Sequence, residues 1–94
     1  MRHELEVMEL QLGAWSAKIG SLNAAHLQSG VHARFETVIY LDELRALHAI
    51  ARSNFDRYRA AGAPERAELE PALEAAWDEL ATAMKRRPPP RTGS

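Results

Sequence analysis

Apolar residues recur at alternating intervals of three and four along two tracts of this chain, and Gly62-Ala63-Pro64 separates the tracts. Intervals of this kind place apolar side chains along one face of an α-helix and are typical of a coiled-coil seam. The first tract contains Leu5, Met8, Leu12, Trp15, Ile19 and Leu22 and, after an interruption, Leu41, Leu44, His48, Ala51, Phe55 and Tyr58; the second contains Leu69, Leu73, Ala76, Leu80 and Ala83. The pattern predicts an all-α fold, a coiled-coil-like helical hairpin with a long helix over 5–61 and a shorter antiparallel helix over 65–86.

The two predicted helices are unequal in length. At about 1.5 Å per residue, residues 5–61 would form a rod of roughly 80 Å and residues 65–86 one of roughly 33 Å. The uncovered half of the long helix therefore needs an apolar partner, which a second copy or the chain itself could supply. We predict a homo-oligomer, most simply a two-fold dimer, because a two-fold interface lets one apolar stripe serve both copies. The expected interface contains Leu5, Met8, Leu12, Trp15, Ile19, Leu22, Leu47 and Ile50.

The hairpin seam follows from the predicted turn. Gly62 stands just past the expected end of the first helix, and Pro64 falls in the first turn of the next one, as both residue types prefer. The seam comprises Leu41, Leu44, His48, Ala51, Phe55 and Tyr58 from the long helix and Leu69, Leu73, Ala76 and Leu80 from the shorter one. A turn centred on Ala63-Pro64 pairs Tyr58 with Leu69, Phe55 with Leu73, Ala51 with Ala76 and His48 with Leu80. Pro71 predicts a mild kink in the second helix.

Glycines mark the weakest part of the long helix. Gly13, Gly20 and Gly30 each cost about 1 kcal/mol relative to alanine in a helix interior. The phase of the apolar pattern also shifts by one position between Leu27 and Leu41, which fits either a locally rewound helix or a break. We favour a continuous helix because no proline occurs between Leu27 and Phe35. The alternative is a chain that folds back near Gly30 into a three-helix bundle.

The carboxyl end differs in composition from the rest. Residues 1–87 form the predicted hairpin domain, and three prolines after Lys85-Arg86-Arg87 end its last helix. Residues 88–94 are expected to be a flexible proline-rich and basic tail. Such a tail is typically solvated, although a polyproline ligand or a basic contact for phosphate would share its composition.

Composition excludes several classes of function. Charged residues make up 27% of the chain with a net charge of −1, so no bulk field favours nucleic acid or an anionic membrane. The chain has no cysteine, which excludes disulfides and thiolate chemistry. Neither a signal-peptide-like apolar run near the start nor a stretch of about 18 apolar residues is present. We therefore expect a cytoplasmic protein with no membrane or nucleic-acid partner.

No group of residues predicts catalysis. The serines lack a neighbouring base with an orienting acid, so we expect a non-enzymatic protein without a cofactor. His32 and Glu36 share one helical face, but two ligands do not make a metal site. His48 lies on the apolar seam, where a buried and hydrogen-bonded histidine is the common outcome. The alternative function is a metal- or small-ligand-binding bundle in which the oligomer encloses a cavity lined by His26, His32 and His48.

Several stretches carry a family resemblance. They are Leu12, Trp15, Ile19 and Leu22; Leu41-Asp42-Glu43-Leu44-Arg45; Phe55 with Arg59-Ala60-Ala61-Gly62; and Ala76-Trp77-Asp78-Glu79-Leu80 with Ala83. In this order, over about residues 12–84, the chain resembles small bacterial coiled-coil proteins labelled as a stress-response family. The resemblance implies a helical hairpin and no established biochemical activity. Family members carry a tryptophan where this chain has Arg66, and charged or small residues where it has Leu47 and Ile50. These departures concern whether the oligomeric arrangement of the family applies to this chain.

Overall fold

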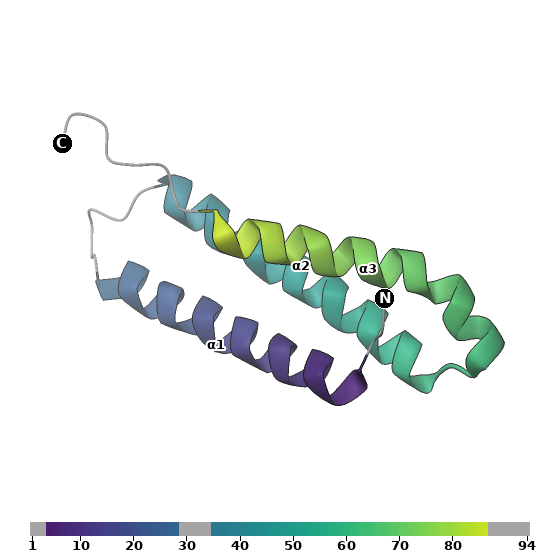
Figure 1. The fold of residues 1–94 in the computed structure, drawn as a ribbon. Coiled ribbons are helices and arrows are strands. Elements are labelled where there is room, and N and C mark those ends of the chain that lie inside the picture. The colour runs from purple at the N-terminus through teal and green to yellow at the C-terminus, as the bar shows by residue number, and fades with distance from the viewer. Residues whose placement is uncertain (1–3, 29–34, 87–94) are drawn as a thin grey trace.

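The computed structural model describes residues 4–28 and 35–86. Three helices occupy these ranges: α1 over Leu5–Gln28, α2 over Phe35–Ala60 and α3 over Ala63–Lys85 (Figure 1). No strand occurs within these ranges, which confirms the predicted all-α class. The predicted break point Gly30, the candidate ligand His32 and the predicted tail over 88–94 lie outside the described residues.

The prediction of one continuous helix over 5–61 is wrong. α1 and α2 are separate helices that lie side by side and run in opposite directions (Figure 1). The longest dimension is 53 Å, well short of the roughly 80 Å that a continuous helix requires. The physical reason is that the amino-terminal apolar stripe finds its partner on α2 of the same chain, as the three-helix alternative anticipated.

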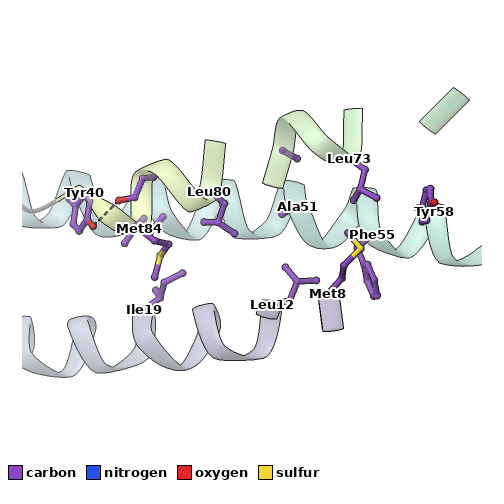
Figure 2. Packing of buried hydrophobic residues seen from close by; sticks show 13 residues of the cluster. Met8, Leu12, Ile19, Tyr40, Ala51, Phe55, Tyr58, Leu73, Leu80 and Met84 are labelled. Atoms are coloured by element: carbon purple, nitrogen blue, oxygen red, sulfur yellow. Dashed lines mark hydrogen bonds between the residues drawn. The ribbon is translucent and has the colours of Figure 1, made fainter. Parts of the chain in front are cut away.

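One face of α1 supplies part of the core. Met8, Leu12 and Ile19 are buried (Figure 2). Leu5, Trp15 and Leu22 are partly exposed and pack against the same cluster. A side-chain contact between Arg59 and Glu9, 3.7 Å apart, joins the end of α2 to the start of α1. The stripe that we predicted to form an oligomer interface is thus part of the core of a single chain, and it is not exposed to a second copy while α1 is docked.

α3 also packs along α2, and its buried side chains join the same hydrophobic cluster as those of α1. Phe55, Leu73, Leu80 and Ala51 are completely buried in one cluster (Figure 2). At one end of the pair, the Arg86 guanidinium lies 3.4 Å from Glu43. At the other end, the Arg66 side chain reaches the α2 carboxyl terminus. These end contacts and the burial of Phe55 agree with the register derived from a turn at Ala63-Pro64.

Three aromatic rings link all three helices. The ring centroids of Trp15 on α1 and Trp77 on α3 lie 5.4 Å apart with a tilt of 57°. The Trp77 ring also lies 6.2 Å from that of Phe55 on α2. Tilted pairs at these distances contribute about 0.5–1.5 kcal/mol beyond the area that they bury. The two tryptophans therefore take part in the packing between the helices.

The turn between α2 and α3 is held by a charged side chain. Arg66 donates from Nε to the Tyr58 carbonyl at 3.0 Å and from a terminal nitrogen to the Arg59 carbonyl at 3.1 Å. A cation on the last carbonyls of a helix satisfies groups without an intrahelical partner and opposes the negative end of the helix dipole. Gly62 is the N-cap residue of α3. Its backbone is extended, with φ −79°, a conformation that does not require glycine.

We predict that Leu12→Ala lowers the free energy of unfolding by about 2–5 kcal/mol, because Leu12 is 1% exposed. Ile39→Ala is the matched control: Ile39 is 51% exposed on α2, so its truncation should change stability by less than about 0.5 kcal/mol. Urea unfolding of micromolar and submicromolar samples measures both effects. A Leu12→Ala cost present only at the higher concentration would contradict packing of α1 within its own chain.

Candidate functional site

The solvent-facing side of α1 is apolar, which is unusual for a helix on the outside of a bundle. Its members, here called the outer face of α1, are Val7, Leu10, Gly13, Ala14, Ala17, Gly20, Ser21, Ala24 and Leu27. Leu10 is 74% exposed, Leu27 69% and Val7 56%. Lys18, at the edge of this face, is the only charged residue among the exposed positions from Leu10 to Leu27. A helix that is apolar all round is normally buried on every side.

Small residues occupy the middle of the outer face. A Cβ atom added to Gly13 or to Gly20 would meet no heavy atom within 4 Å. Neither glycine is therefore needed for packing inside the chain, yet each costs about 1 kcal/mol relative to alanine in a helix interior. Glycine in such a position permits another backbone to approach closely.

The remaining predicted interface residues lie on α2. Leu47 is partly buried against the core, whereas Ile50 is half exposed. Val38 and Ile39 are also exposed on α2. Charged residues such as Asp42 and Arg45 separate them from Ile50 in the sequence. Of the predicted interface residues, only Ile50 lies mainly on the surface, and the others belong to the core or pack against it.

A second surface feature lies where α1 and α3 are not in close contact. This cavity, here called the end groove, has a volume of about 630 Å³. Its described lining consists of Gln11, Trp15, Lys18, Leu22, Tyr40, Ala81, Met84, Lys85 and Arg86. Apolar side chains form its walls, and three cationic side chains contribute to its lining. None of the described lining residues is acidic.

Tyr40 closes one wall of the end groove. Its hydroxyl donates to the Ala83 carbonyl at 2.9 Å (Figure 2) and also lies in hydrogen-bond contact with the Arg86 carbonyl. Burial raises the pKa of the Tyr40 phenol above its ordinary value near 10; Arg86 opposes this shift and Glu43 adds to it. These contacts fix the last turn of α3 against the first turns of α2.

The histidines do not form a metal centre within the described residues. His48 is half-buried, and its Nε2 lies 3.0 Å from the Leu12 carbonyl oxygen, which can only accept, so His48 donates. The histidine predicted beside Leu80 thus makes its hydrogen bond to α1. Among residues 4–28 and 35–86 no group of three or more histidine, aspartate or glutamate side chains is placed to hold a metal ion. His26 is half-buried on α1.

Comparisons with known proteins return nothing: no family model, no curated protein and no solved structure matches this chain. The resemblance to the stress-response coiled-coil family therefore stays a prediction. Of the three described helices, none has both the length and the apolar character that crossing a membrane requires.

Two features of the surface were not predicted from the sequence. The outer face repeats the same three-and-four spacing as the buried stripe, through Leu10, Gly13, Ala17, Gly20, Ala24 and Leu27, but small residues made it less conspicuous. Arg66, considered only as a departure from the family pattern, caps α2. A basic residue two positions after a helix-starting proline is the signal that could have indicated this contact.

We predict that Tyr40→Phe destabilises the fold by about 1 kcal/mol near neutral pH, because the hydrogen bonds to α3 are lost. Since the folded-state pKa of Tyr40 is raised, its contribution is fully present below pH 10 and declines as the pH rises through the folded-state pKa. The stability difference between the wild type and Tyr40→Phe should therefore narrow above about pH 10. Urea titrations between pH 7 and about pH 11 measure this difference, and a constant difference would contradict it.

Proposed function

We propose that this protein is a non-enzymatic helical interaction module that associates with a second copy of itself through the outer face of α1. The observation that carries the proposal is the exposure of Leu10, Leu27 and Val7 on a face whose exposed positions from Leu10 to Leu27 include one charged residue, Lys18 at the edge. Glu6 lies on the same face at its amino-terminal end. Contiguous apolar surface of this kind marks interaction sites on soluble proteins. The proposal keeps the self-association expected from the sequence but assigns it to the opposite side of α1.

The order of residue sizes along the outer face favours an antiparallel two-fold dimer. In that arrangement Leu10 faces Leu27 of the second copy, Gly13 faces Ala24, and Ala17 faces Gly20. Large residues thus meet at both ends, and small residues meet throughout the middle, where the backbones could approach closely. A two-fold axis requires such self-complementarity, because each residue pair occurs twice.

Charge along α1 supports the same orientation. The amino-terminal end carries Glu6 and Glu9, whereas His26 is the basic residue of the last turn and Lys18 lies near the middle of the helix, next to the two-fold axis. Antiparallel pairing brings the acidic end of one copy next to the more basic end of the other and also opposes the two helix dipoles. A parallel pair would place the acidic ends together.

The area of the outer face indicates how strongly two copies should associate. Since α1 has 24 residues, a strip along it is about 36 Å long and about 10 Å wide, or roughly 360 Å² on each copy. Stable interfaces bury about 800 Å² on each partner. We therefore expect weak association, with a dissociation constant in the micromolar range. A reversible module of this kind is compatible with the resemblance to a stress-response family.

The test is the mass in solution as a function of concentration. Light scattering coupled to gel filtration should give a mass that rises toward twice 10.5 kDa between micromolar and millimolar protein. Leu10→Glu and Ala17→Glu should each remain monomeric over this range, because a dimer would bury the new carboxylate without a partner. Both positions are exposed in the single chain, so helicity and unfolding of the dilute protein should not change.

Ile50→Glu is the matched control, because Ile50 is also an exposed aliphatic residue, at 50%, but lies on α2. It should dimerise as the wild type does. A wild type that stays monomeric at millimolar concentration would contradict the proposal. So would a loss of association in Ile50→Glu with none in Leu10→Glu, which would move the interface to α2.

A further inference from the structure

We propose that the end groove binds an anionic amphiphile, a single alkyl chain that ends in a carboxylate. This inference does not depend on self-association, since Gln11, Trp15 and Leu22 of α1 line the groove and lie off the outer face, and only Lys18, at the edge of that face, is shared. Its volume of about 630 Å³ falls within the range of about 300–1,000 Å³ that small-molecule sites occupy.

The lining matches an alkyl chain. Trp15 and Leu22 on α1 and Met84 on α3 provide an aromatic ring, a branched aliphatic group and a flexible thioether. Met84 is buried, and Trp15 and Leu22 are partly buried against the core, so the walls are already packed in place before any ligand arrives. Unbranched side chains such as methionine adapt to chains of varying shape.

The charges match a carboxylate. Lys18 and Lys85 have no ion-pair partner within the part of the chain that the structure describes, whereas the third cation, Arg86, already contacts Glu43 at 3.4 Å. The Gln11 amide adds a neutral donor from the same side of α1. Lysine and amide donors beside an apolar wall favour an anionic head group over a cationic or a neutral one.

The extent of the groove favours a small molecule over a docked helix. Its α1 wall runs from Gln11 to Leu22, which is about 16 Å or three turns of helix. A helix seated there would gain few anchoring positions, whereas an extended alkyl chain would use the whole length. The hydrogen bonds of Tyr40 to the α3 carboxyl end hold the far wall in place.

Decanoate is the probe, added below its critical micelle concentration to protein at low micromolar concentration. Tryptophan emission should change with a saturable dependence on decanoate, because Trp15 lines the groove. Decylamine, which has the same chain with the opposite charge, should bind at least tenfold more weakly. Methyl resonances of Leu22 and Met84 should shift on binding, whereas that of Ile50, which lies outside the groove lining on α2, should not.

Lys18→Glu tests the head-group contact and should weaken decanoate binding on the order of tenfold, since it removes an attraction and adds a repulsion. Arg57→Glu is the matched control, because it also replaces a cation with a carboxylate, but at an exposed position of α2 outside the groove lining. It should bind decanoate as the wild type does.

Several outcomes would overturn the proposal. The proposal is wrong if tryptophan emission shows no saturable change with decanoate. It is also wrong if decylamine binds as tightly as decanoate, or if Arg57→Glu weakens decanoate binding as much as Lys18→Glu does. If raising the protein concentration alone shifts the Leu22 and Met84 resonances, a second copy occupies the groove and the amphiphile proposal is wrong. Because outer-face dimerisation is measured as mass without any ligand, either proposal can fail without the other.

Discussion

The burial of one apolar stripe of α1 against α2 is the interaction on which the rest of this structure depends. With Met8, Leu12 and Ile19 in the core, the first helix folds back instead of extending the second. That choice turns the opposite side of α1 toward solvent. It also places α1 next to α3, where the two helices meet at Trp15 and Trp77 and leave the end groove beyond. The outer face of α1 and the end groove therefore both result from the packing of α1 against α2.

A chain of this length has little core to spare. Domains of this size bury a limited fraction of their surface, so each large buried side chain contributes a considerable part of the net stability. Here α2 is the central element, because both other helices pack along it. The ring contacts of Trp77 with Phe55 and Trp15 are the place where all three helices meet. Loss of that aromatic contact would loosen α1 and α3 together.

The sequence identified the buried positions within 41–58 and 69–83, because both segments carry large apolar residues at regular helical intervals. Leu44, Phe55, Leu73 and Leu80 are completely buried, as that pattern requires. The path of residues 5–28 could not be predicted in the same way. Apolar spacing identifies a face that needs a partner, but it does not say whether the partner is the same chain or another.

The surfaces were harder to predict than the core for a physical reason. The end groove is made by residues far apart in the sequence, such as Lys18 and Lys85, which come together only through the fold. The middle of the outer face consists mostly of glycine and alanine. These residues contribute little to a hydropathy pattern, even where the face that they form carries almost no charge. Arg66 contacts backbone carbonyls, and its position two residues after Pro64 was the one local signal in the sequence for that contact.

The position of α1 also has a consequence for the motions of the native state. α1 packs mainly along α2 and carries Gly13 and Gly20 in its interior. Units with fewer tertiary contacts and weaker helix propensity open before the whole molecule unfolds. Backbone amides of α1 should therefore exchange with solvent as one cooperative group, ahead of those in α2 and α3. Any partner that covers α1 would slow that exchange and couple its own binding to the order of the first helix.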